Sequence, residues 1–138
     1  PGNQPGSTGG LVSSLDLGPT LLAQAGLSAV YGMQGIDATP LLTDSTATIR
    51  DEIFIEEDQL NDILQVGTPL RMRTVITEDT RLTVYQGYDG IELFDLREDP
   101  NEMHNRVDDK VLQAQMTERL MRTLMETNDL SPKPTAFA

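Results

Sequence analysis

The sequence predicts an α+β fold in which a small antiparallel sheet of about four strands carries a C-terminal helix packed across it. Between residues 51 and 96, short stretches alternate apolar and polar side chains and are separated by turn-forming residues, as in consecutive antiparallel strands. Residues 108–127 contain no Gly or Pro and repeat apolar side chains at helical spacing. A chain of 138 residues is long enough to bury one core of this kind.

Residues 11–27 are expected to begin with a short extended stretch and then to form a helix. Asp16 can cap this helix, and Pro19 falls in its first turn, where the missing backbone N–H does no harm. Gly26 then ends the helix, because glycine readily adopts the left-handed conformation that closes a helix.

The segments on either side of this helix have the composition of loops. Residues 1–10 are rich in Gly, Pro and Ser, which indicates a linker or a cut end. Residues 28–49 contain two glycines and a proline and predict a loop with one helical turn at residues 40–43.

Residues 51–57 form the first predicted strand. Ile53 and Ile55 would lie on one face of this strand and Phe54 on the other. Residues 58–67 remain ambiguous, because their apolar residues have helical spacing but the segment is short.

Three further strands are predicted at residues 70–77, 81–87 and 91–96. The Glu-Asp-Thr sequence at 78–80 turns the chain between the first two of these strands. The Tyr-Asp-Gly sequence at 88–90 predicts a hairpin turn, because Asp-Gly tolerates the positive φ values that such turns need. Strands joined by tight turns pair with their sequence neighbours, so the expected arrangement is an antiparallel meander.

The apolar stripe of the C-terminal helix is expected to pack on this sheet. The stripe consists of Leu112, Met116, Leu120 and Leu124, with Met121 and Met125 beside it. Methionines at such spacing could also bind a cofactor or a target peptide, but packing is the simpler interpretation. The remaining tail, residues 129–138, contains two prolines and is expected to lie extended along a surface.

The composition of the chain argues against several classes of function. Acidic residues outnumber basic ones by 22 to 10, so the net charge of −12 argues against nucleic acid and membranes as partners. The absence of cysteine excludes disulfides, thiolate metal sites and a cysteine nucleophile. We expect a soluble chain, because no apolar run approaches the ~18 residues of a membrane span. No signal peptide is visible, and nothing indicates the compartment.

The stretch GIELFDLREDPNEMHN, residues 90–105, combines a strand with acids, a proline and a histidine. We expect the strand to end at Leu96 and the chain to turn through Asp99 and Pro100, since proline cannot serve a following ladder. Glu102 and Asn105 would then cap or brace the loop that leads to the C-terminal helix.

Alternative chemistry for this stretch is weakly supported. A calcium loop based on Asp95 and Asp99 would place Arg97 at a ligand position and lacks the required glycine. His104, the only histidine, is expected to be solvated or braced, because a base or ligand needs partners. None of the serines available for a Ser-His-Asp triad lies in a G-x-S-x-G elbow: Ser13, Ser14, Ser28, Ser45 and Ser131. The sequence therefore predicts no catalytic residue and no metal site.

Five sequence motifs, in this order, resemble the C-terminal part of sulfatases: LVSSLDLGPTLLAQAGL, MQGIDATPLL, RDEIFIEE, RMRTVITEDTRLTVYQG and ELFDLREDPNEMHN. The wider group, in the alkaline phosphatase superfamily, includes arylsulfatases, choline-sulfatase-like enzymes and phosphonate monoester hydrolases. The resemblance runs from about Pro1 to Asn128. It implies that residues 1–49 are a helical remnant of the end of the α/β sulfatase domain and that residues 50–138 are the C-terminal subdomain.

The resemblance also implies that the catalytic machinery of the parent lies upstream. In the family, that machinery comprises a formylglycine formed within C/S-x-P-x-R and a divalent metal with its ligands. The nearest serine version here, SPKPT, lacks the arginine. We therefore expect no cofactor in this chain and a segment that is non-catalytic on its own. In relatives this segment closes one side of the active site and in some groups contributes oligomer contacts.

Arg71 and Arg73 are the candidate site residues. Both would project from one strand face and could contact an anionic substrate at the cleft rim; the alternative is that they pair with surface carboxylates. Expected partners are the upstream catalytic domain or a second copy, because the apolar face of residues 11–27 would lie against a sheet that this chain lacks. The alternative function is a standalone interaction or dimerisation module derived from a sulfatase tail.

Overall fold

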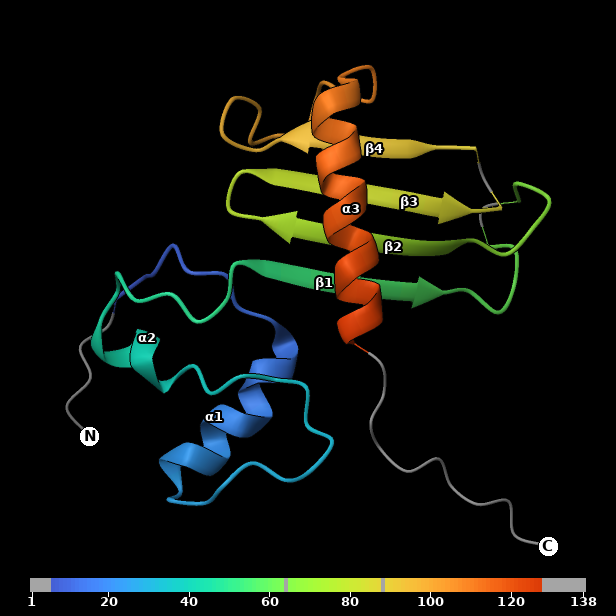
Figure 1. Cartoon of the computed structure of the whole chain (residues 1–138). Coiled ribbons are helices and arrows are strands. Elements are labelled where there is room, and N and C mark those ends of the chain that lie inside the picture. Colours follow the sequence, from blue (N-terminus) through green and yellow to red (C-terminus); the bar gives the residue numbers. More distant parts are fainter. Residues whose placement is uncertain (1–5, 64, 88, 128–138) are drawn as a thin grey trace, which may run out of the picture. The chain divides into compact units, whose positions relative to one another are not determined.

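The computed structural model describes residues 6–63, 65–87 and 89–127, and it divides into two compact units (Figure 1). Unit 1 comprises Pro1–Ile49 and Met125–Ala138, and unit 2 comprises Arg50–Leu124. The predicted assignment of residues 1–49 to the end of an α/β domain remains a prediction.

Unit 1 contains the short helices η1 (Ser14–Asp16), α1 (Leu17–Gln24) and α2 (Thr39–Thr43). The expected helix within residues 11–27 and the helical turn at 40–43 are thus confirmed. Gly26 follows α1 with a φ of +73°, the conformation expected of a glycine that ends a helix.

Asp16 is not the simple helix cap that the sequence suggested. The 3-10 turn η1 precedes α1, and Ser13 caps it, with its hydroxyl accepting from the backbone N–H of Leu15. The Asp16 carboxylate instead accepts from the backbone N–H of Ser13 at 2.7 Å and of Ile36 at 2.8 Å. Asp16 therefore joins the start of the helix to a loop twenty residues later.

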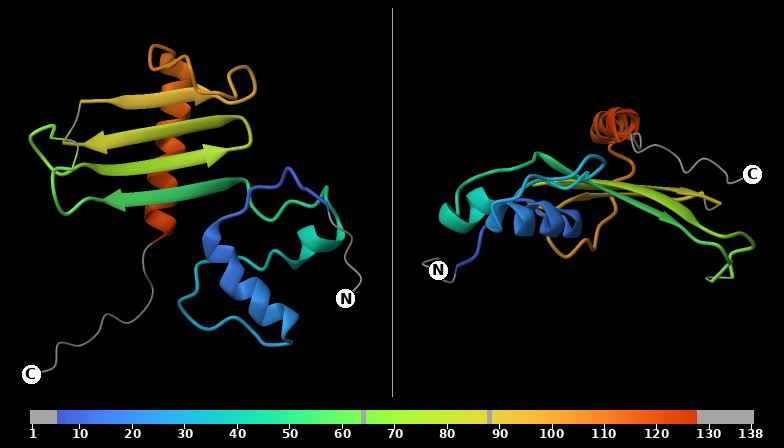
Figure 2. Two further views of the ribbon diagram at one scale, coloured as in Figure 1. Left: turned by 180° about the vertical axis from the view of Figure 1, so that it is seen from behind. Right: turned by 90° about the horizontal axis from the view of Figure 1, so that it is seen from below.

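Unit 2 is built on a four-stranded antiparallel sheet of order β1-β2-β3-β4. The strands are β1 (Glu52–Asp58), β2 (Arg71–Thr77), β3 (Thr80–Gln86) and β4 (Ile91–Asp95). Helix α3 (Lys110–Glu126) crosses all four strands on one face (Figures 1 and 2). The predicted α+β fold, with its sheet and packed C-terminal helix, is confirmed.

The structure shows the conformation of two connections, β1–β2 and β3–β4, in more detail than the sequence predicted. The described residues between β1 and β2 contain no helix, which resolves the ambiguity of residues 58–67; Leu64 lies outside the described residues. Between β3 and β4 the ladder ends at Val84 and Ile91, and Gly87 has a φ of +90°. Tyr88 of the predicted turn, like the predicted extended tail, lies outside the described residues.

The core of unit 2 lies between α3 and one face of the sheet. Val75, Leu82 and Leu93 are opposite one another on adjacent strands and are each 0% exposed. Met116 and Leu120 of α3 complete this buried cluster. Leu112, Met116 and Leu120 of the apolar stripe therefore pack on the sheet as expected, whereas Leu124, Met121 and Met125 are exposed.

The other face of the sheet carries the alternate residues of every strand. At its centre, the hydroxyls of Thr74 and Thr83 lie 2.9 Å apart, and both residues are buried. Ile53 and Ile55 lie on this face and Phe54 packs against the core under α3, as the sequence predicted. This second face is thus mixed, with polar groups at its centre and apolar residues around them.

Candidate functional site

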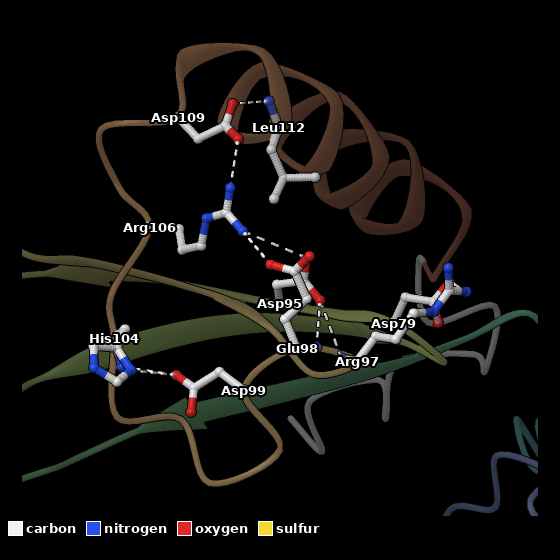
Figure 3. Close-up of polar contacts among 9 residues, drawn as sticks. All are labelled: Asp79, Asp95, Arg97, Glu98, Asp99, His104, Arg106, Asp109 and Leu112. Atoms are coloured by element: carbon white, nitrogen blue, oxygen red, sulfur yellow. Dashed lines mark hydrogen bonds and ion pairs between the residues drawn. The ribbon is translucent and has the colours of Figure 1, made fainter.

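The connection between β4 and α3, residues 96–109, gathers most of the charged side chains that the sequence singled out (Figure 3). Arg106 lies within 3.6 Å of Asp95, 3.2 Å of Glu98 and 3.5 Å of Asp109. Asp109 in turn accepts from the backbone N–H of Leu112 at 3.0 Å and so caps α3. Arg106 therefore ties the end of β4 to the start of the helix.

Two carboxylates outside this connection, those of Asp95 and Asp79, bond to groups within it. Asp95 accepts from the backbone N–H of Arg97 and of Glu98, each at 3.1 Å. The Arg97 guanidinium contacts the Asp79 carboxylate at 3.0 and 2.6 Å. Among the described residues, no group of three or more His, Asp or Glu side chains is arranged to hold a metal ion.

His104 is held at the surface through its backbone rather than its imidazole. Its N–H donates to Asp99 Oδ2 at 2.7 Å, while Nδ1 lies 3.5 Å from the same oxygen and the side chain is 85% exposed. The backbone N–H groups of Met103 and then His104 hold the pKa of the Asp99 carboxyl below its ordinary value of 3.8. Asp99 is thus a loop-forming residue that needs its negative charge.

The amide signals of Met103 and His104 should therefore follow the ionisation of Asp99. A carboxyl whose pKa is lowered by folding stabilises the loop fully above its unfolded value, and this stability is lost as the pH falls through the lower, folded value. In an acid titration monitored by NMR, we expect both amides to shift with a midpoint below 3.8. Asp99→Asn should abolish that transition, and a midpoint at or above the ordinary value would contradict the assignment.

Arg81 joins several charged and polar side chains of unit 2, and it was missed by the sequence analysis. Its guanidinium bonds Glu102 at 2.7 and 2.9 Å, Glu92 at 3.3 Å and the Thr83 hydroxyl at 3.0 Å. It also lies 5.0 Å from the centre of the Phe94 ring. The only feature of the sequence that could have pointed to Arg81 was its position on the strand face opposite Leu82 and Val84. Arg81 binds the connection to the sheet face that α3 leaves open.

The outer edge of β4 is covered by the same connection. Asn105 Oδ1 accepts from the Leu93 N–H at 3.0 Å, and Asn105 Nδ2 donates to the Ile91 carbonyl at 2.8 Å. The Arg106 N–H donates to the Leu93 carbonyl at 2.7 Å. The expectation that Glu102 and Asn105 brace this loop is confirmed, and the bracing occupies a strand edge.

The candidate residues Arg71 and Arg73 lie on the face of β2 that also carries Val75. Arg73 contacts Glu56 at 2.8 Å and Asp58 at 2.9 Å, and its hydrogen bond lowers the pKa of the Asp58 carboxyl. Arg71 is exposed and has no ion pair among the described residues. Pairing with carboxylates is what the structure shows for Arg73, whereas contact with a substrate remains a prediction for both.

A small hollow opens where β1 and β3 end and β2 begins. Its volume is about 190 Å³, and it is lined by Glu57, Gln59, Leu70, Met72 and Tyr85. Burial, followed by the nearby Glu92 carboxylate, raises the pKa of the Tyr85 phenol. The hollow is smaller than the roughly 300 Å³ at which ligand pockets begin.

The SLDLGPTLL motif of unit 1 is explained by packing. The Thr20 hydroxyl donates to the Asp16 carbonyl and accepts from the Ala38 N–H at 2.8 Å. Gly35 approaches Leu15 so closely that an added Cβ would overlap its carbonyl group. The motif therefore joins α1 to the loop that follows it, and it presents no reactive group of its own.

The family of the chain follows from its match to a known family model. The model described as N-sulphoglucosamine sulphohydrolase, C-terminal, matches residues 2–129. The chain belongs to this family. The resemblance to the C-terminal part of sulfatases is thereby confirmed.

Solved structures agree with this family. A 2-O GAG sulfatase shares 25% identity with this sulfatase segment at a TM-score of 0.62, over 80% of this chain and 23% of that chain. A protein in complex with its substrate D-glucosamine-2-N,6-O-disulfate shares 28% identity at a TM-score of 0.61, over 81% and 23%. The sulfatase segment thus spans less than a quarter of the length of these two chains. No curated protein matches it.

A phosphonate monoester hydrolase from Silicibacter pomeroyi has the same fold. Its TM-score is 0.70 at 20% identity, over 87% of the sulfatase segment and 26% of the hydrolase chain. The similarity of fold therefore extends beyond sulfatases. No helix among the described residues of the segment is long and apolar enough to cross a membrane.

Proposed function

We propose that this chain is the non-catalytic C-terminal segment of a sulfuric or phosphonic ester hydrolase and that it closes one side of the active site of its parent. The family match to a C-terminal model carries this proposal. The sequence supports it, because it contains no C/S-x-P-x-R motif from which a formylglycine could form. Arg71 and Arg73 are the residues proposed to face the anionic substrate from the rim of the cleft.

The surface of unit 1 supports association with an upstream catalytic domain. Leu17, Leu21, Leu27 and Val30 are between 59% and 69% exposed although they are aliphatic. Aliphatic surface of this kind gains about 25 cal/mol for each Å² that a partner removes from water. The partner that best fits this arrangement is the large α/β domain to which residues 1–49 would belong.

A turnover assay tests the absence of catalysis. The purified chain should hydrolyse neither an aryl sulfate, nor a phosphonate monoester, nor D-glucosamine-2-N,6-O-disulfate, with Mn²⁺ or Ca²⁺ present, because it lacks a formylglycine motif. A full-length hydrolase of the same group, assayed in parallel, controls for the substrates and metals. Turnover above the buffer blank that survives repurification would refute the proposal.

A second candidate is a standalone interaction module that pairs with its own copies. The same exposed aliphatic residues of unit 1 favour it, since two copies could bury them against each other. Size-exclusion chromatography with light scattering separates the candidates: a dimer that is weakened by Leu21→Ser supports the module, and a monomer at all concentrations contradicts it. The reading frame upstream of the Pro1 codon gives an independent answer, because a continuing frame with a C/S-x-P-x-R motif supports the first proposal.

A further inference from the structure

The small hollow of unit 2 lies on the sheet face away from α3. Glu57, Met72 and Tyr85 are opposite one another on β1, β2 and β3, so their side chains share this face. Gln59 and Leu70 continue the pairing, with the Gln59 N–H donating to the Leu70 carbonyl at 2.9 Å. The hollow that these five residues line measures about 190 Å³, which is the volume of roughly six water molecules in the liquid. It therefore suits one small chemical group.

One polar atom of this lining lacks a hydrogen bond. Gln59 Oε1 is buried and has no partner within the described part of the chain, although Gln59 Nε2 donates to Glu57 Oε1 at 3.2 Å. A buried acceptor without a donor is unfavourable, and nearly all such groups in folded proteins are satisfied by protein or by a bound molecule. A hydrogen-bond donor that enters the hollow can satisfy this one.

The charges around the hollow favour a donor that is also a cation. The lining contains one carboxylate, that of Glu57, and no basic side chain. Burial, and then the carboxylates of Glu92 and Glu57, raise the pKa of the Tyr85 phenol, which therefore stays neutral beside them. The Tyr85 ring is in addition an aromatic group of the kind whose face attracts cations. An anion such as sulfate finds no cation in this lining.

We propose that the hollow is a binding site for a primary alkylammonium group, either that of a lysine side chain or that of a small free amine. An ammonium has three donors and no acceptor, which complements Gln59 Oε1 and the Glu57 carboxylate. Its alkyl chain would lie against Leu70 and Met72, as lysine stems lie along apolar surface. The site stands on the far face of the sheet from Arg71 and Arg73 and does not depend on the proposed hydrolase role.

An NMR titration with n-butylammonium tests this site, with n-butanol as its uncharged counterpart. Butylammonium should shift the Met72 methyl and Gln59 side-chain amide signals to saturation. The dissociation constant should be on the order of millimolar, because so small a group buries little surface. n-Butanol occupies nearly the same volume without the charge and should bind at least about five-fold more weakly. Equal binding of the two compounds, or no saturable shift with butylammonium, overturns the proposal.

Two glutamate variants separate the hollow from the general negative charge of the chain. Glu57→Gln should weaken butylammonium binding about two- to five-fold, as expected for one exposed charge pair. Glu56→Gln is the matched control, because it removes the same charge from the neighbouring residue, which lies on the other face and pairs with Arg73. It should change the binding by less than about 1.5-fold, since salt screens a charge on the far face. Equal weakening in both variants overturns the site.

A lysine derivative identifies the source of the ammonium group. Nα-acetyl-lysine methylamide presents the same group on a peptide backbone. If it binds as tightly as butylammonium, the hollow accepts a lysine side chain of a partner protein. If only butylammonium binds, the ligand is a free amine. Both results support the site, and neither changes the expected outcome of the turnover assay.

Discussion

Leu82→Ala is expected to lower the free energy of unfolding of unit 2 by about 2–5 kcal/mol. Leu82 is 0% exposed and lies between Val75 and Leu93 on the neighbouring strands, beneath α3. Removing its side chain loses the hydrophobic transfer energy and leaves a cavity, which the two flanking strands cannot close without breaking their ladder. Urea denaturation followed by circular dichroism gives the difference, with the slope of the transition unchanged.

Leu60→Ala is the matched control for this prediction. Leu60 carries the same side chain in the β1–β2 connection but is 93% exposed. Its replacement should change the stability by no more than about 0.5 kcal/mol. A similar loss in both variants would show that the helix-covered face of the sheet is not the core of unit 2.

Gly35→Ala is expected to disrupt unit 1 with a cost of about 3 kcal/mol or more. A Cβ at this position would overlap the Leu15 carbonyl oxygen and crowd the Asp16 N–H at 3.1 Å. Both atoms belong to the backbone, so no side chain can turn away to relieve the overlap. The loop would have to withdraw, and the hydrogen bond from Ile36 to the buried Asp16 carboxylate would break. Faster hydrogen exchange of the Ile36 amide measures this loss.

Gly9→Ala provides the comparison within the same unit. A Cβ added at Gly9 meets no atom within 4 Å, so the substitution should leave the Ile36 amide as protected as before. Equal protection in Gly35→Ala would mean that the close approach of the loop to η1 does not contribute to the stability of unit 1.

The regular elements of unit 2 could be predicted because their signals are local. Two such signals are the alternation around Val75, Leu82 and Leu93 and the helical stripe that contains Leu120. Both depend only on which residues fall on the apolar side of a strand or helix. The class of fold and the family resemblance followed from the same stretches. Asp16 takes part in the capping box with Ser13, but its second bond was not predicted because it goes to Ile36, twenty residues away in the sequence.

Whether a contact of the candidate site could be predicted depended on how far apart its two residues lie in the sequence. Arg81 and Glu102 are 21 residues apart, and nothing in their immediate surroundings distinguishes them from other surface charges. The face on which Arg81 lies was readable from alternation, but its partner was not. In Arg73, by contrast, pairing with surface carboxylates was one of two stated possibilities, and the structure shows it with Glu56 and Asp58.

The chain's order of apolar and polar residues determined its strands and its long helix, since side-chain direction alternates with a fixed period in each regular element. Only the tertiary structure decided that Asn105 and Arg106 cover the edge of β4 and that Glu102 anchors them through Arg81. The physical reason is that a hydrogen bond forms where two groups meet within about 3 Å. The fold of the backbone brings the two groups of such a bond together, and the composition of the sequence does not show which groups will meet.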